Sequence, residues 1–190
     1  MSAIPTSLMT VEQYVNNERT ADFKSEFYRG EIFAMAGGTV QHATIGGNIF
    51  AALRSKLRGT GCSARNSDQR IKVASNSLGT YPDASVVCGK YQTHPEDVDA
   101  ITNPRVIFEV LSKSTESYDR GKKFDLFRGL ESLREYVLVS QEEPQVERYV
   151  RHEDETWTLT IFKGTDAVVR FESIDAELTL AEIYEDVEFE

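Results

Sequence analysis

The chain has 190 residues, of which 21 are lysine or arginine and 31 are aspartate or glutamate, so its formal net charge is −10. A chain of this length buries about 70% of the surface that its unfolded form exposes, which predicts a single globular domain, 1–190, that needs no structural metal. The chain has no run of about 18 apolar residues, so we expect no membrane span. The first ten residues lack the basic and apolar runs of a secretory signal, so we expect a cytoplasmic protein.

The cysteines and histidines are too scattered to predict a zinc site. Cys62 and Cys88 lie 26 positions apart without a CxxC motif, so we expect reduced, buried thiols. The three histidines, His42, His94 and His152, are also far apart in the sequence.

The acidic charge is concentrated in the last part of the chain. Residues 121–190 hold 8 basic and 18 acidic side chains, and 8 − 18 accounts for the whole net charge of −10. Between residues 54 and 72, six basic residues stand against Asp68 alone: Arg54, Lys56, Arg58, Arg65, Arg70 and Lys72. This basic segment could face a polyanion, or its charges could simply be solvated on a helix end and strand edges.

Capping and hydrophobic periodicity predict the elements of the first third of the chain. Residues 10–13 form a capping box that starts a short helix. Arg29-Gly30 separates two short β-rich runs, 27–28 and 31–35, and predicts a hairpin in which Gly30 takes a positive φ. Apolar residues at 45, 49, 53 and 57 predict a long helix that Gly59 ends as a C-cap.

The remaining pattern alternates strands with a helix and predicts an α/β fold. Strands are expected at 70–74, 83–88, 106–111 and 135–139, with a turn-rich segment at 75–82, a polar loop at 89–105 and a second helix at 119–133. Residues 146–174 alternate like an antiparallel meander, and a capping box at 179–182 starts a terminal helix.

Two acidic residues interrupt apolar strands. Asp83 opens the run 83–88, and Glu109 stands in the middle of 106–111, where a buried carboxylate is costly unless it is paired, protonated or bound to a cation. Carboxylates on adjacent strands suit Mg²⁺ or Mn²⁺, which take oxygen ligands together with water and substrate phosphate. The alternative is that each acid pairs with a lysine or arginine, or that Asp83 merely begins a strand.

The second predicted helix offers a cation to these acids. At 100° per residue, Lys123 shares a face with Asp119, Leu126, Phe127 and Leu130, so its ammonium should point toward the sheet. There it could orient or deprotonate a water and neutralise charge on a phosphate in the transition state. A lysine whose stem lies along apolar surface while its head reaches water is the alternative.

The order of Pro82-Asp83, Glu109 and a following lysine resembles the PD-(D/E)xK nuclease superfamily. In that motif the lysine stands two residues after the second acid, where this chain has Leu111. The resemblance implies that Lys123, on the following helix, supplies the missing charge.

More closely, the chain is similar to the Uma-two family of restriction-endonuclease-like proteins. The matching segments are Glu26 to Glu31 with Met35 and His42, Tyr81 to Asp83, Glu109 to Ser112 with Ser114-Thr115, Asp119-Arg120 with Lys123, and Glu135 to Val139. Lys113 departs from the proline that the family often has there.

The resemblance implies a restriction-endonuclease-like fold, a mixed sheet flanked by helices with a carboxy-terminal antiparallel β extension, and metal-dependent hydrolysis of phosphodiester bonds. It implies that Asp83 and Glu109 bind Mg²⁺ or Mn²⁺, that Lys123 is the catalytic lysine, and that Glu26 completes the site. DNA is the expected substrate, and a homodimer is expected by analogy, because two symmetric sites cut two strands.

Other functions fit the sequence less well. No Gly-Lys-Ser/Thr follows the paired glycines, which argues against a P-loop. Ser112 with His42 or His94 suggests a serine hydrolase only at the level of composition. His42, near the start of the first predicted long helix, could approach the site, or it could be a helix-cap or core hydrogen bonder. A module that kept the fold but lost catalysis, with its acids paired to Lys123 or an arginine, is the competing class.

Overall fold

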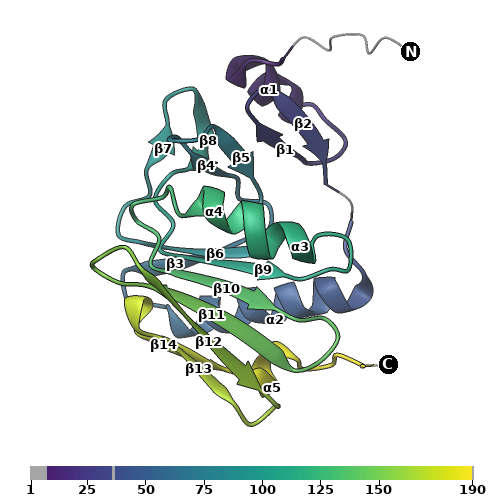
Figure 1. Cartoon of the computed structure of the whole chain (residues 1–190), viewed down its shortest axis with the longest axis vertical. Coiled ribbons are helices and arrows are strands. Elements are labelled where there is room, and N and C mark those ends of the chain that lie inside the picture. Colours follow the sequence, from purple (N-terminus) through teal and green to yellow (C-terminus); the bar gives the residue numbers. More distant parts are fainter. Residues whose placement is uncertain (1–7, 36, 190) are drawn as a thin grey trace.

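The computed structural model describes residues 8–35 and 37–189. Most of the segment 1–10, for which no secretory signal was expected, lies outside the described residues. Two sheets have six strands each, and the one with the longer strands, here called the large sheet, has the order β12-β11-β10-β9-β6-β3 (Figure 1). It is mixed, because β9 and β10 run parallel while the other neighbours are antiparallel. Its strands are β3 (Cys62–Asn66), β6 (Ala84–Cys88), β9 (Val106–Val110), β10 (Glu135–Val139), β11 (Gln145–Arg151) and β12 (Trp157–Lys163).

Both faces of this sheet are covered, which explains why its central strands are apolar at nearly every position. On one face, Val106, Phe108 and Val110 of β9 pack in a core with the helix α2 (Val40–Lys56). On the other face, Ile107 packs in a core with the helical segment 116–127. That segment consists of α3 (Glu116–Tyr118), a π-helical turn η1 (Asp119–Lys123) and α4 (Phe124–Phe127).

A second six-stranded sheet, in the order β2-β1-β5-β4-β8-β7, lies beside the helical segment. Its strands are β1 (Ser25–Tyr28), β2 (Glu31–Ala34), β4 (Ile71–Val73), β5 (Leu78–Thr80), β7 (Thr93–His94) and β8 (Asp97–Ile101). Helix α1 (Val11–Glu18), which begins at the Thr10 capping box, packs through Tyr14 and Val15 against Phe27 of β1. The hairpin β1–β2 therefore stands at one end of the molecule, as an edge of this sheet.

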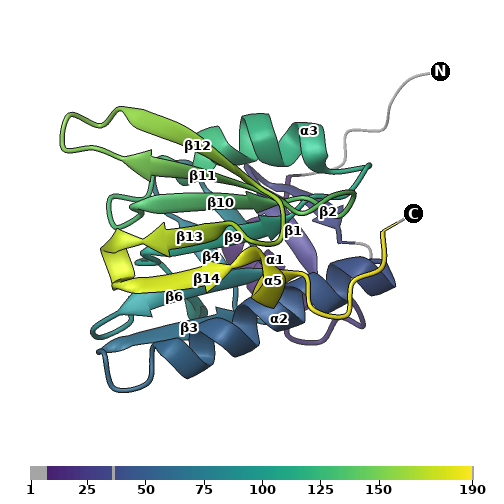
Figure 2. The ribbon, with the colours of Figure 1, turned by 90° about the horizontal axis from the view of Figure 1, so that it is seen from below.

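The carboxy-terminal part forms a small antiparallel sheet of β13 (Val168–Phe171) and β14 (Ala176–Thr179), followed by α5 (Leu180–Ile183). Figure 2 shows this unit and α2 on the face of the large sheet opposite the helical segment. The α/β fold with mixed sheets, flanking helices and a carboxy-terminal antiparallel extension is thus as predicted. No helix in the described part of the chain is long and apolar enough to cross a membrane.

Several predicted elements need correction. The polar loop 89–105 contains β7 and β8, the turn-rich segment 75–82 contains β5, and the strand β3 follows α2. The second helix starts at 116 and ends at 127 rather than spanning 119–133. The predicted meander is wrong in its last strand, because β13 pairs with β14 in a separate sheet and not with β12. Helix α2 ends at Lys56 with Leu57 as its C-cap, and Gly59 takes its positive φ in the turn that follows.

The cysteine prediction is also wrong. Cys62 and Cys88 are register partners on β3 and β6 and form a disulfide, with their Cα atoms 3.9 Å apart. Sequence spacing gave no sign of this pairing, because an antiparallel register is decided only when two strands meet in the sheet.

The basic segment 54–72 does not form one exposed surface. Arg70 is buried and paired with Asp97 at 2.6 Å, and Lys72 is only 2% exposed. Lys56 pairs with Glu182 at 2.9 Å. The segment winds through a helix end and two different sheets, so its charges point in different directions.

Candidate active site

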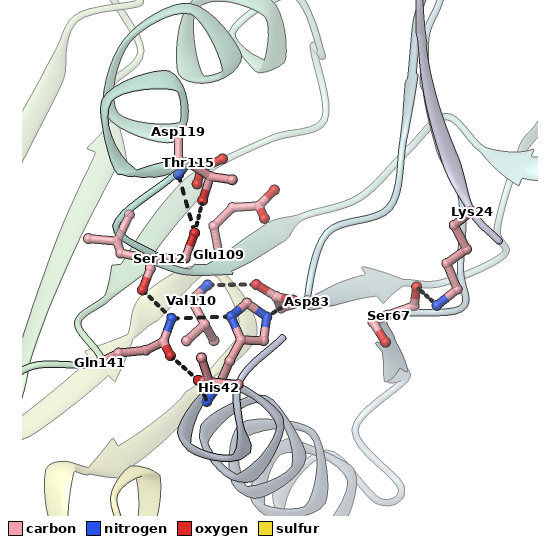
Figure 3. A network of polar contacts seen from close by, with 12 residues as sticks. Lys24, His42, Ser67, Asp83, Glu109, Val110, Ser112, Thr115, Asp119 and Gln141 are labelled. Atoms are coloured by element: carbon pink, nitrogen blue, oxygen red, sulfur yellow. Dashed lines mark hydrogen bonds and ion pairs between the residues drawn. The ribbon is translucent and has the colours of Figure 1, made fainter. Parts of the chain in front are cut away.

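The two acids predicted on adjacent strands lie opposite each other. Ala84 of β6 pairs with Phe108 of β9, so Asp83, which directly precedes β6, is expected opposite Glu109 if this antiparallel register is continued by one residue. The backbone N–H of Val110 donates to Asp83 Oδ2 at 2.7 Å, which fixes the carboxylate at the strand end (Figure 3).

Strand alternation then points Glu109 toward the helical segment. Glu109 shares a face of β9 with Ile107, and that face is covered by residues 116–127. The carboxylate is 4% exposed, and its Oε1 atom lies 2.8 Å from Lys123 Nζ. Lys123 also reaches Asp119 Oδ1 at 3.4 Å. The structure therefore brings Lys123 to Glu109 from the following helical segment, as the amphipathic pattern predicts.

Burial and the charges of neighbouring side chains dominate the electrostatics of this group. Burial raises the pKa of Glu109 well above its ordinary range; Lys123 opposes the rise, while Asp119 and Asp83 add to it. Burial lowers the pKa of Lys123, but the charges of Glu109, Asp119 and Glu26 outweigh it, so the pKa stands above its ordinary value. A charged Lys123 can donate hydrogen bonds, and its part in orienting or deprotonating a water stays a prediction.

Glu26 reaches the same place from the second sheet. It lies on β1, is 7% exposed, accepts a hydrogen bond from Thr80 Oγ1 at 2.8 Å and another from the Tyr118 hydroxyl. Because Tyr118 is on the helical segment that carries Lys123, this contact joins the second sheet to that segment at the site.

His42 belongs to the site as well. Thr39 caps α2 and accepts from the His42 backbone N–H at 3.1 Å, and the ring Nε2 then lies 2.8 Å from Asp83 Oδ1 (Figure 3). The hydrogen bond with Asp83 raises the pKa of His42 above its ordinary value. A Cβ added at Gly38 would lie 2.6 Å from His42 Cδ2, so glycine is needed there for the ring to fit.

A cavity of about 700 Å³ connects these side chains. The four site residues predicted from the sequence all line it: Glu26, Asp83, Glu109 and Lys123. His42 and Asp119 line it as well. Ser112 lines it too, but its hydroxyl contacts Ser114 and Thr115, and in residues 8–35 and 37–189 neither His42 nor His94 bonds to it. The geometry of a serine hydrolase is therefore not found.

The donor set fits a hydrated hard cation rather than a fully protein-ligated one. No group of three or more His, Cys, Asp or Glu side chains in the described part of the chain is arranged to hold a metal ion. Mg²⁺, however, is commonly held by one or two carboxylates, with water and substrate phosphate completing its ligands. Asp83 and Glu109 supply that pair of carboxylates, and the excess of acids over Lys123 favours an added positive charge.

Comparison with known proteins agrees with this architecture. The family Uma2, described as "Putative restriction endonuclease", matches residues 11–182. The chain belongs to this family. Two uncharacterised Synechocystis proteins are similar along their length: slr1290 is 31% identical over 185 residues (97% of this chain, 96% of the relative), and sll1609 is 32% identical over 171 residues (90% and 97%).

The fold itself is shared with a solved structure. The crystal structure of "a putative nuclease belonging to DUF820" from Anabaena variabilis ATCC 29413 superposes with a TM-score of 0.73 at 17% identity, covering 93% of this chain and 97% of that one. Uma2 membership and this likeness together indicate a restriction-endonuclease-like fold.

Sequence reasoning assigned no role to two residues that the structure places at the site. Asp119 stands four residues before Lys123, and this i, i+4 spacing is the signal that could have assigned it as a partner of the lysine. The contact of His42 with Asp83 joins residues 41 positions apart, so no local pattern could have revealed it.

Proposed function

We propose that this Uma2 protein is a metal-dependent endonuclease that hydrolyses phosphodiester bonds in DNA. The observation that carries the proposal is that one cavity holds Asp83, bonded to the backbone N–H of Val110, and the neighbouring Glu109, whose carboxylate lies 2.8 Å from the Lys123 ammonium. Two carboxylates and one cation at a cavity are the groups that phosphodiester hydrolysis needs to hold a metal and to offset negative charge.

In this proposal each side chain has a distinct task. Asp83 and Glu109 hold Mg²⁺ or Mn²⁺, which when bound polarises the scissile phosphate and lowers the pKa of a water. Lys123 donates hydrogen bonds that orient the attacking water and offset charge developing on the phosphate. His42 and the Val110 N–H hold the Asp83 carboxylate in place, and Glu26 completes the acidic wall.

The test is cleavage of supercoiled plasmid and single-stranded DNA with Mg²⁺, with Mn²⁺ and with a chelator. Asp83→Asn and Glu109→Gln should abolish cutting and also remove the rise in melting temperature that Mg²⁺ gives the wild type, because ligand binding to the folded state raises its stability. Lys123→Met should abolish cutting.

Asp125→Asn is the matched control, since Asp125 is an exposed acid on the same helical segment and pairs only with Arg128, at 3.5 Å, in the described part of the chain. Its cutting should equal that of the wild type. Absence of both cutting and a metal-dependent thermal shift in the wild type would refute the proposal. It would favour the module without catalysis, in which the Glu109–Lys123 ion pair is structural.

We also propose, by analogy with nucleases that pair two symmetric sites, that the protein acts as a homodimer. Analytical ultracentrifugation tests this; a monomer at assay concentrations would contradict it.

A further inference from the structure

The hairpin β1–β2 gives the proposed active site an aromatic wall. Phe33 of β2 is the register partner of Glu26 of β1, so both side chains, with Tyr28, lie on the face of the hairpin that lines the cavity. Phe33 is 47% exposed, and no aromatic pair in the described part of the chain includes it. Its ring is thus open on the cavity side, directly beside a carboxylate of the site.

A free ammonium stands next to this wall. Lys122 lines the cavity, and its Nζ lies 4.5 Å from the centroid of the Tyr28 ring. Among the described residues Lys122 makes no ion pair, in contrast to its neighbour Lys123, which is buried between Glu109 and Asp119. Lys122 is therefore available to a phosphate.

The charges around the cavity do not suit a long duplex backbone. Four acids line it against two lysines, and the net charge of the chain is −10. Arg54, the nearest exposed cation of the basic segment on α2, lies twelve residues beyond His42 on that helix, or about 18 Å along its axis. Duplex affinity comes mainly from many cationic phosphate contacts. Apart from Lys122, an exposed cation beside this wall is Arg29, 5.3 Å from the Tyr28 ring, so we expect binding here to draw on a further source.

Base stacking could supply this additional binding energy, and it requires an unpaired base. Aromatic side chains bind bases of any sequence by their faces, and such stacking is available only to single strands or to nucleotides turned out of a duplex. A cavity of about 700 Å³ has the size of pockets that enclose small organic ligands and can accept one nucleotide.

We propose that the site binds an unpaired nucleotide of single-stranded DNA, whose base stacks on Phe33 while Lys122 contacts an adjacent phosphate. The proposal deepens the nuclease function above, since it assigns the substrate class of the same site. The phosphate to be cut then lies at Asp83 and Glu109, in the same cavity as the stacked base.

Fluorescence anisotropy with a labelled 12-nucleotide single strand, alone or annealed to its complement, tests this proposal. Binding is measured in EDTA and again with Ca²⁺, which takes oxygen ligands as Mg²⁺ does. The wild type should bind the single strand at least tenfold tighter than the duplex. Phe33→Ala should weaken single-strand binding about 5- to 150-fold, the range of one lost stacking contact, and Phe33→Tyr should retain it.

Ile32→Ala is the matched control, because Ile32 is the adjacent exposed residue of β2 and does not line the cavity. Its binding should equal that of the wild type. Lys122→Met should reduce the slope of log affinity against log salt concentration by about 0.7, the value for one phosphate contact on a single strand.

Equal or tighter binding of the duplex, equal losses in Phe33→Ala and Ile32→Ala, or no binding of the single strand in either buffer would overturn the inference. The two proposals fail separately. Metal-dependent cutting of plasmid but not of single-stranded DNA, or cutting of single-stranded DNA that Phe33→Ala leaves intact, keeps the nuclease function and rejects the inference. Phe33-dependent binding without any cutting rejects the nuclease function alone.

Discussion

Replacing Lys123 with methionine removes the buried cation that faces Glu109 and Asp119. Methionine is of similar size and leaves the stem's packing intact, so the change acts mainly on charge. Glu109, at 4% exposure, is then left without a cation and must take up a proton or stay charged at a cost. Leaving a buried charge without its partner destabilises a protein by about 3–5 kcal/mol.

The cost depends on pH in a direction that can be worked out. Without the lysine, the pKa of Glu109 in the folded state rises further above its value in the unfolded state, about 4.3. Stability is therefore kept below about pH 4.3 and lost as pH rises toward the folded-state pKa. Keeping the Glu109 carboxyl protonated costs about 1.4 kcal/mol for each pH unit above about 4.3. The stability lost in Lys123→Met is therefore at most about 1 kcal/mol at pH 5 and about 5 kcal/mol at pH 8.

Urea unfolding of wild type and Lys123→Met at pH 5 and pH 8 measures this difference. Addition of Glu109→Gln to Lys123→Met should recover at least half of the loss at pH 8, because the unpaired carboxylate is then gone. An equal loss at both pH values, or a double variant no more stable than Lys123→Met, would refute the electrostatic reasoning.

Two further predictions concern the packing around the site and the disulfide. Gly38→Ala should lower the rate of DNA cleavage as much as His42→Ala does, because the added Cβ would displace the ring. Gly37→Ala, whose Cβ would meet no atom within 4 Å among the described residues beyond its chain neighbours, should leave the rate unchanged in the same assay. The Cys62–Cys88 bond closes a loop of 26 positions, so its reduction should lower the free energy of unfolding by about 3 kcal/mol in the chain-entropy view. Urea unfolding with and without a reducing agent measures that loss, and identical curves, with the bond verified by mass spectrometry, would contradict it.

The sequence allowed two chemical groups of the site to be predicted from local patterns. Glu109 interrupts an apolar strand, and Lys123 falls on the inward face of an amphipathic helix. Glu26 breaks no such pattern, and only the family resemblance suggested it. The structure places all three around one cavity, while their roles stay predictions.

The sequence alone determined the strands and helices whose periodicity is strong, the acids at 83 and 109, and the lysine that faces them. Tertiary structure decided the contacts between distant segments: the register that sets Asp83 opposite Glu109, the meeting of His42 with Asp83, and the disulfide. The physical reason is that periodicity and capping act within a few residues. Register and packing, in contrast, are fixed by burial of whole strand and helix faces, which no short segment encodes.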